Sequence, residues 1–192
     1  MNIVHYGGFF VNLTITSKEE ILKAGRKIAQ EKGLSAINMR SVAAECNIAL
    51  GTLYNYYSNK DELVLAVIES IWKDIFHIKE CKDDISFLDF VVFILSCLKD
   101  SKEKYPNFFV THSMILESKV KDEAKDRMNN CFIHIKAMML SVLENDKTID
   151  SSCFSKSFSK NDFISFVFSN ILLTELNAID EQALIEVIKR II

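Results

Sequence analysis

The chain has 192 residues, of which 49% are hydrophobic, and its 23 basic and 26 acidic side chains give a formal net charge of −3. A chain of this length and apolar content can bury a sizeable core, which excludes a disordered protein. It contains only five Gly and one Pro, and no Gly follows position 51. Sandwiches, barrels and doubly wound sheets need tight turns that use Gly and Pro, so the composition predicts an all-α fold.

The N-terminal segment and the cysteines indicate the compartment. Residues 1–16 are apolar and uncharged, but they lack the basic start of a signal peptide and are shorter than the roughly 20 residues that span a bilayer. The five cysteines show no paired spacing such as C-x-x-C. We therefore expect a flexible N-terminal arm over residues 1–16 and a cytoplasmic protein with no membrane partner.

Charge is distributed unevenly along the chain. Residues 17–60 carry seven basic and four acidic side chains, a balance of +3, which leaves −6 for the rest of the chain. A basic N-terminal segment on an acidic body would orient the molecule toward phosphate. A charge of +3 supports a nucleic-acid interface but is too small to establish one.

Four short helices are predicted near the N-terminus. The first begins after Ser17, has two glutamates in its first turn, and ends at Gly33. The second covers residues 39–46 with Asn38 as its N-cap. Asn47 follows, and because Asn tolerates a left-handed backbone it can close this helix. The third and fourth helices are expected over 50–56 and 61–77, and the wide apolar stripe of the fourth predicts that it joins two domains.

Five further helices are expected, which brings the total to about nine. Their predicted ranges are 85–104, 107–117, 122–144, 161–177 and 181–191. Residues 147–159 include five serines and are predicted to form a loop.

The second and third helices have the features of a helix-turn-helix. This motif needs a small residue where the helices cross, a permissive turn residue and apolar residues that fix the crossing angle. Ala43, Asn47, Ile48 and Leu53 satisfy these requirements. Leu53 and Tyr57 lie on the inward face and are expected in the core. The outward face presents side chains suited to groove and phosphate contacts, namely Thr52, Asn55 and Tyr56, with Gly51 and Tyr54 near the leading end.

The stretch NMRSVAAECNIALGTLYNYYSNKDEL, residues 38–63, resembles the TetR (tetracycline-repressor) family of bacterial regulators. The resemblance covers about residues 17–72 and rests on the aromatic pattern after Gly-Thr-Leu, followed by Lys and an acidic pair. It implies a helix-turn-helix DNA-binding domain over 17–77, with its motif at 38–57. It also implies a helical ligand-binding and dimerisation domain over 78–192.

The resemblance also implies roles for single residues. Asn38 and Arg40 would touch the DNA backbone, and Lys60 would hold another phosphate. The residues expected to read base edges and thymine methyls are Gly51, Thr52, Tyr54 and Asn55, with Tyr56 near phosphate. Many family members have an aromatic residue or His at the position of Asn55, and this departure leaves the operator sequence open. Many also have Phe at the position of Tyr57, where the difference is interpreted as a core substitution.

The C-terminal half is expected to dimerise and to bind an effector. Its penultimate helix is apolar nearly all round, so a twin helix is its natural partner, with an interface of Phe163, Phe166, Val167, Ile171 and Leu172. A homodimer suits a palindromic double-stranded operator. Candidates to line a cavity for a small-molecule effector are Trp72, Phe76, Phe93, Phe108, Phe109, Met114, Met138 and Met139. Such stripes also occur as plain core.

Metal, cofactor and enzyme functions are not expected. His77 with Cys81, and Cys131 with His134, could each offer two ligands, but a structural zinc site needs four and nothing links the pairs. No Gly-rich phosphate loop, H-E-x-x-H or G-x-S-x-G motif is present. The predicted function is a sequence-specific, homodimeric transcriptional repressor that a small apolar ligand releases from its operator. The alternatives are a helical interaction module and an activator without ligand response.

Overall fold

The computed structural model of the protein describes residues 16–76, 85–109 and 122–192, and gives the backbone alone for 122–131. Within these ranges there are eight α-helices, two 3₁₀ helices and no strand, which confirms the all-α fold. The α-helices are α1 (Lys18–Lys32), α2 (Met39–Glu45), α3 (Leu50–Tyr54), α4 (Lys60–Ile75), α5 (Phe87–Lys104), α7 (Asp122–Asn145), α8 (Lys160–Glu175) and α9 (Glu181–Ile191).

The predicted helices agree with the observed ones to within two residues at each end, apart from the one expected over 107–117, which lies mostly outside the described residues. The serine-rich stretch 147–159 differs from the expected loop. It contains a 3₁₀ helix at Ser151–Cys153, because the Asp150 carboxylate accepts a hydrogen bond from Ser152 N (2.9 Å) and caps this turn.

Side-chain caps determine where several helices begin. At the start of α1, Glu20 N donates to Ser17 Oγ (3.2 Å) and Ser17 N donates back to Glu20 Oε2 (2.9 Å). The same reciprocal arrangement joins Ser159 and Asp162 at the start of α8. Such caps satisfy amides that the helix itself leaves unbonded. They fix the first turn of each helix locally.

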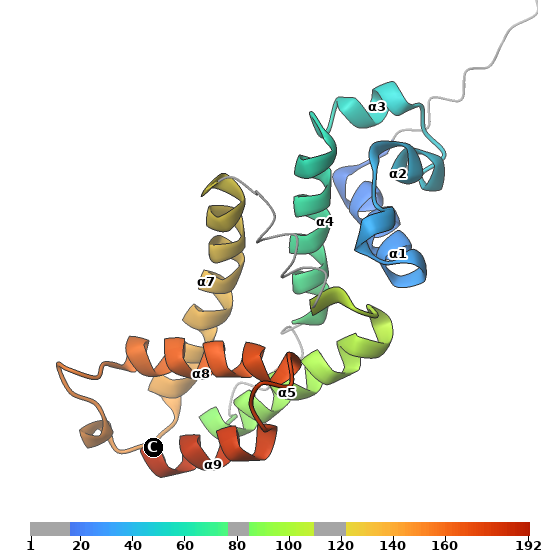
Figure 1. Ribbon diagram of the computed structural model, residues 1–192. Coiled ribbons are helices and arrows are strands. Elements are labelled where there is room, and N and C mark those ends of the chain that lie inside the picture. The colour runs from blue at the N-terminus through green and yellow to red at the C-terminus, as the bar shows by residue number, and fades with distance from the viewer. Residues whose placement is uncertain (1–15, 77–84, 110–121) are drawn as a thin grey trace, which may run out of the picture.

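Helix α4 connects the two halves of the molecule. It contacts α1 on one side and α5 and α7 on the other. In Figure 1 it runs between α1, α2 and α3 and the helices of the C-terminal half. Its buried residues cover most of its circumference, as the sequence predicts. They are Leu63, Val64, Ala66, Val67, Ile68, Ser70, Ile71, Trp72 and Ile75.

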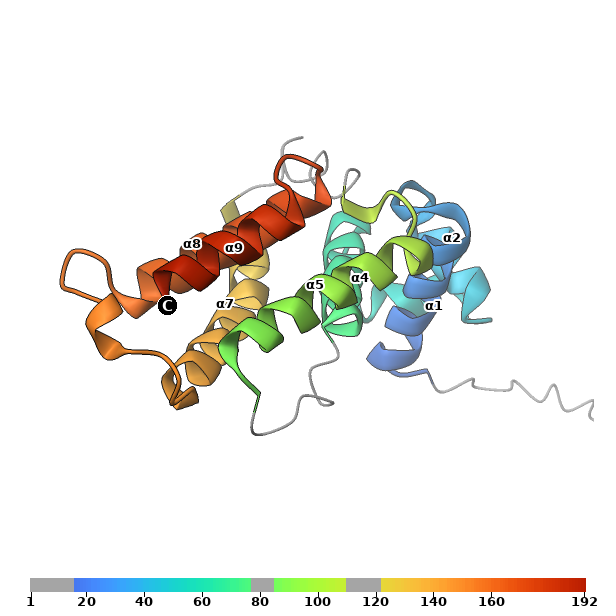
Figure 2. The same cartoon turned by 90° about the horizontal axis from the view of Figure 1, so that it is seen from below.

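The C-terminal half is a packed group of four helices. Helix α8 contacts α7, α9 and α5, and α9 also contacts α5; Figure 2 shows α8 and α9 side by side. Phe163 of α8 is fully buried, with the rings of Phe87, Phe154 and Phe158 within 6.3 Å of its own ring. In the described ranges, no helix is both long and apolar enough to cross a membrane.

Candidate nucleic-acid interface

The turn between α2 and α3 depends on Asn47. Its φ is 53°, which confirms the left-handed backbone expected there. Two hydrogen bonds close the end of α2, from Asn47 N to Ala44 O (3.1 Å) and from Ile48 N to Ala43 O (3.0 Å). This is the Schellman pattern, with Asn in the place where Gly is usual. The turn sets the angle at which α3 leaves α2.

Helix α3 is anchored by its inward side chains. Leu53 has no exposed surface and Tyr57 is buried, which confirms both as core residues. The opposite side is open to solvent: Gly51 and Asn55 are exposed, Tyr54 is half-exposed, and Thr52 is partly buried. The four residues expected to read bases therefore lie on α3 or, for Asn55, at its C-cap, on the side opposite the buried Leu53.

Gly51 has no packing role within the protein. A Cβ at this position would meet nothing within 4 Å, and the residue lies in the helix with no positive φ. Gly in a helix costs roughly 0.5–1 kcal/mol relative to Ala. No contact of Gly51 with the described part of the chain offsets that cost. A residue without a side chain at an exposed helix start suits the close approach of another surface.

Asn38 acts as the N-cap of α2. Its Oδ1 accepts from Arg40 N and Ser41 N, both at 3.0 Å, and its Nδ2 donates to Ala36 O (3.2 Å). The carboxamide expected to touch DNA is thus engaged in positioning the helix. Arg40, in the first turn, is exposed and makes no ion pair within the described part of the chain.

Tyr56 is tied to the segment before α1. Its hydroxyl donates to Thr16 O (2.6 Å), and Thr16 is buried. Because that proton is already donated, the hydroxyl would have to leave Thr16 before it could donate to a phosphate. The periodicity of the sequence gives no sign of this contact, which joins residues 40 positions apart.

The first turn of α4 carries an exposed basic side chain, that of Lys60. Two of the seven basic residues in 17–60 pair internally, Arg26 with Glu19 (2.8 Å) and Lys27 with Glu45 (2.6 Å). The hydrogen bond that Lys27 Nζ donates to Glu45 Oε1, together with the charge of Glu45, raises the pKa of Lys27. Lys60 is exposed on the first turn of α4, directly after α3.

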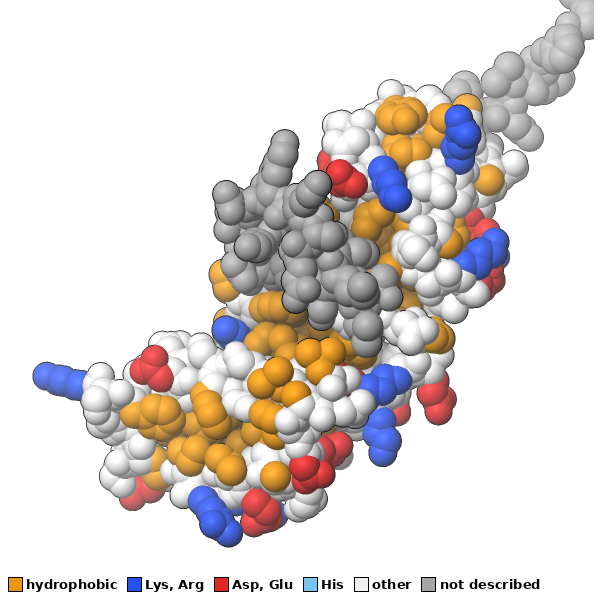
Figure 3. Space-filling view, viewed as in Figure 1, with side chains coloured by type: hydrophobic (Ala, Val, Ile, Leu, Met, Phe, Trp, Pro, Cys, Tyr) orange, Lys and Arg blue, Asp and Glu red, His pale blue; other side chains and the backbone are white. Residues whose placement is uncertain are grey.

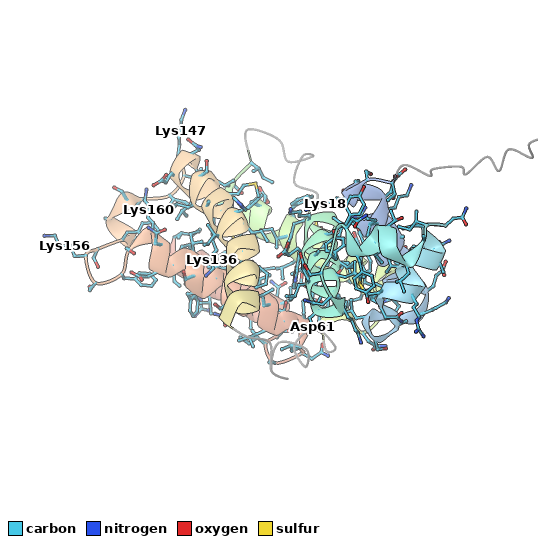
Figure 4. The ribbon with its side chains drawn as sticks, turned by 90° about the horizontal axis from the view of Figure 1, so that it is seen from above. Lys18, Asp61, Lys136, Lys147, Lys156 and Lys160 are labelled. Atoms are coloured by element: carbon cyan, nitrogen blue, oxygen red, sulfur yellow. The ribbon has the colours of Figure 1, made fainter. Side chains whose placement is uncertain are left out.

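The lysines of the C-terminal half lie elsewhere. Figure 4 places Lys147, Lys156 and Lys160 at the end of the molecule opposite the N-terminal helices. They cannot add to a cationic surface around α3.

Four of the candidate effector residues form a cluster of aromatic rings with Phe132, in which Trp72 stacks on Phe76 and meets the other rings edge to face. The ring of Trp72 lies 5.5 Å from that of Phe76, 5.4 Å from Phe108, 5.7 Å from Phe109 and 5.2 Å from Phe132. We call these five rings the aromatic cluster. Met139 is buried and Met138 and Phe93 are partly buried. Met114 lies outside the described residues, as do His77 and Cys81, and the side chain of Cys131 is likewise not described; its expected partner His134 is exposed.

The residues expected at the dimer interface divide into two groups. Phe163, Val167 and Ile171 have no exposed surface and face the protomer's own core, whereas Phe166 is 42% exposed and Leu172 partly buried. Three exposed apolar residues of α8, its C-terminal end and α9 were not in the expected interface, namely Leu173, Leu176 and Val187, with exposed fractions of 38–46%. Helical spacing could have added Leu173 to a face that includes Phe166, because Leu173 lies seven residues after it. Figure 3 shows hydrophobic side chains gathered where Figure 1 places α8 and α9.

Comparison with known proteins agrees with this arrangement. Residues 21–67 match the model for bacterial regulatory proteins of the tetR family. The chain is 30% identical over 77 residues to the regulator UidR of Escherichia coli K12, and 36% identical over 70 residues to a helix-turn-helix regulator of Staphylococcus aureus USA300. These matches cover 40% and 35% of the chain, and they span only 39% and 37% of the two relatives' own lengths.

The likeness of fold extends over most of the chain. A transcriptional regulator from Rhodococcus sp. Rha1 matches with a TM-score of 0.63 at 16% identity, covering 88% of this chain and 87% of that one. The multidrug binding protein EbrR, complexed with imidazole, gives 0.61 at 16% identity and covers 91% and 93%. FadR from Bacillus subtilis, in complex with stearoyl-CoA, gives 0.59 at 14% identity and covers 91% and 95%.

Fold and site together define an all-helical, helix-turn-helix protein. Over residues 21–67 the chain is similar to the bacterial regulatory proteins of the tetR family, and its fold is similar to that of solved transcriptional regulators.

Proposed function

We propose that the protein is a sequence-specific DNA-binding transcriptional regulator whose α3 reads base edges in the major groove. The observation that carries this proposal is Gly51. It is an exposed glycine within α3, and no contact with the described part of the protein requires a glycine there. Thr52 and Asn55 on the same short helix supply a hydroxyl, a methyl group and an amide. Such groups discriminate between base pairs in the major groove.

The proposed binding unit is a homodimer formed through α8 and α9. From Phe163 to Thr174, α8 has no charged side chain, and its outer face carries the exposed Phe166 and Leu173. A second copy of the same face would cover them. Two α3 helices would then enter successive major grooves about 34–36 Å apart, which suits a palindromic operator.

We infer that an effector controls the affinity for DNA and that it is small and apolar. The aromatic cluster forms an apolar region at the C-terminal end of α4, the helix that follows the DNA-binding motif, and Met139 is buried in the same hydrophobic core. The fold neighbours FadR and EbrR bind stearoyl-CoA and imidazole. An effector releases the operator only if it prefers a conformation in which the α3 helices are wrongly spaced. In that case the regulator is a repressor.

A binding experiment separates the two roles assigned to the interface. Anisotropy of labelled duplexes would be measured with DNA flanking the protein's own gene and with an unrelated duplex of equal length. Lys60→Ala should weaken binding to both duplexes and reduce the slope of log affinity against log salt by about 1. Asn55→Ala should cost about 1–3 kcal/mol on the preferred duplex and far less on the unrelated one.

Lys156→Ala provides the matched control. It removes the same charge at the end of the molecule opposite α3, so its affinity and salt slope should equal those of the wild type. If Lys156→Ala and Lys60→Ala have equal effects, or if Asn55→Ala lowers affinity equally on both duplexes, the assignment of the interface fails. If the wild type binds neither duplex, the chain is a helical interaction module instead.

A further inference from the structure

A partly buried polar contact joins the end of α4 to the end of α5. Tyr105, directly after α5, is 2% exposed, and its hydroxyl donates to Asp74 Oδ2 at 2.7 Å. Asp74 lies in the last turn of α4. Lys104 Nζ is 2.7 Å from the same carboxylate oxygen. The carboxylate at the end of α4 is thus held by two consecutive residues at the end of α5.

Helix α1 contributes to the same contact. The charge of Arg26 on α1 lowers the pKa of both Tyr105 and Asp74. Burial, and then the hydrogen bond and charge of Asp74, raise the pKa of Tyr105 well above its ordinary value. The phenol therefore remains a neutral donor at physiological pH. The Tyr105 hydroxyl of the C-terminal half thus bonds α4 of the N-terminal half, close enough to α1 for the charge of Arg26 to act on it.

The same residue begins a tight turn that leads to the aromatic cluster. Phe108 N donates to Tyr105 O (3.1 Å), and Asn107 between them has a left-handed φ of 61°. Pro106 occupies the remaining position, with its φ fixed by its ring. The ring of Phe108 lies 6.2 Å from that of Tyr105 and 5.4 Å from that of Trp72. The turn is short and constrained, so Phe108 cannot move far without moving Tyr105.

We propose that the turn from Tyr105 to Phe108 couples the aromatic cluster to the DNA-binding helices, with the hydrogen bond from Tyr105 to Asp74 as its mechanical link. This inference rests on the proposed function, since it names the residues through which effector binding changes the affinity for DNA. Displacement of Phe108 within the cluster moves Tyr105 and lengthens its bond to Asp74. The last turn of α4, against which α1 packs, is then released from the end of α5.

The Tyr105 bond is better suited to this role than the ion pair beside it. The side chain of Lys104 is 51% exposed, and exposed ion pairs contribute little because water screens them and the flexible side chain adapts. The phenol is rigid and buried, and its bond is directional. A shift of Tyr105 by a few tenths of an ångström therefore changes its hydrogen bond to Asp74. The flexible side chain of Lys104 instead adjusts and keeps its ion pair with the carboxylate.

Trp72 makes the coupling measurable without knowledge of the effector. It is the only Trp in the chain and sits in the aromatic cluster. It lies twelve residues along α4 from Lys60, about 18 Å by the helical rise, and so beyond direct contact with DNA at α3. Coupling between two sites is reciprocal. DNA bound at α3 should therefore change the emission of Trp72.

The test follows Trp72 emission while the full-length protein is titrated with a duplex selected for binding, and anisotropy of the labelled duplex measures affinity separately. In the wild type the emission should change in proportion to occupancy. Tyr105→Phe should leave the dissociation constant within about threefold of the wild type yet reduce the emission change to less than about a third. Far-UV circular dichroism and Tm would establish that this variant is folded.

Two further variants complete the design. Ser101→Ala removes another buried hydroxyl of α5, one that bonds only its own helix at Leu98 O, and should retain the wild-type emission change. Lys104→Gln, which removes the ion pair alone, should retain it as well. Loss of the change in Lys104→Gln but not in Tyr105→Phe would overturn the proposal.

The outcomes also separate this inference from the function on which it rests. Binding of DNA by the wild type with no change in Trp72 emission would overturn the inference alone. An equal change in the wild type and Tyr105→Phe would do the same. No DNA binding by the wild type would overturn the proposed function and, with it, the coupling.

Discussion

Gly25 of α1 lies directly against Val67 of α4, so close that a Cβ at position 25 would overlap Val67 Cγ2. Both residues are fully or nearly buried. The missing side chain allows the two helices to cross at a short distance. Since α2 packs on α1 and α3 packs on α2, this crossing also sets where α3 stands relative to α4.

Gly25→Ala should therefore destabilise the protein. The added methyl group forces α1 away from α4, at a cost of about 1–3 kcal/mol, and the better helix propensity of Ala recovers about 1 kcal/mol or less. Urea denaturation monitored by circular dichroism would measure the free energy of unfolding. The double variant with Val67→Ala should lose less stability than the sum of the single losses, by at least about 0.5 kcal/mol. Strict additivity would show that the two residues do not compete for the same space.

Gly51→Ala should have the opposite effect on stability and a harmful effect on binding. A Cβ at position 51 meets open space, so the variant should gain roughly 0.5–1 kcal/mol from helix propensity, seen as a higher Tm. The same methyl group would stand between α3 and the bases, and DNA affinity should fall by about tenfold or more, measured by anisotropy. A variant that is more stable and binds DNA as well as the wild type would remove the main support for α3 as the reading element.

Acid stability should depend in part on Asp146. Burial opposes its ionisation, but hydrogen bonds from Thr148 and from Phe87 N (2.8 Å) outweigh burial and lower its pKa. A carboxyl whose pKa is lower in the folded state contributes stability above its unfolded pKa of about 3.9, and this contribution is lost as the pH falls through the folded pKa.

Asp146→Asn keeps an acceptor for Phe87 N but does not titrate. It should be less stable than the wild type at pH 7, and the difference should shrink as the pH falls below about 4. Thermal unfolding across pH 2–7 would measure both curves. Parallel curves over the whole range would contradict a lowered pKa at this residue.

Phe166→Lys should separate the proposed dimer without unfolding the protomer. The residue is 42% exposed and lies on the outer face of α8, so a charge there disrupts an apolar interface but costs the protomer about 0.5 kcal/mol or less. Light scattering should give twice the 22.0 kDa chain mass for the wild type and the single mass for the variant. Val92→Lys, at an equally exposed position on α5, should remain dimeric. Dimers in both variants would place the interface elsewhere.

Local features of the structure could be predicted from the sequence because neighbouring residues determine them. Ser17 and Asn38 cap their helices through atoms two or three residues away. Asn47 takes the left-handed backbone because it is one of the few residues other than Gly that do so at low cost. Leu53 and Tyr57 face the core because helical periodicity places them there.

Contacts between residues far apart in the chain could not be predicted in the same way. Tyr56 bonds Thr16 and Tyr105 bonds Asp74 across 40 and 31 positions, and no periodic pattern relates such pairs. The orientation of α8 could not be predicted either. Because it is apolar nearly all round, its sequence could not indicate that Phe163 and Val167 face the protomer's own core while Phe166 and Leu173 face outward.

The most direct measurement of the central claim is selection of bound duplexes from a random-sequence library by the purified full-length protein. The account predicts enrichment of one palindromic sequence whose half-sites are centred about 10–10.5 base pairs apart, or a multiple of that, as two α3 helices in one homodimer require. It also predicts that Thr52→Ala and Asn55→Ala enrich sequences changed within the half-sites. Recovery of sequences without symmetry, or of the same sequence by both variants, would contradict a dimer that reads DNA through α3.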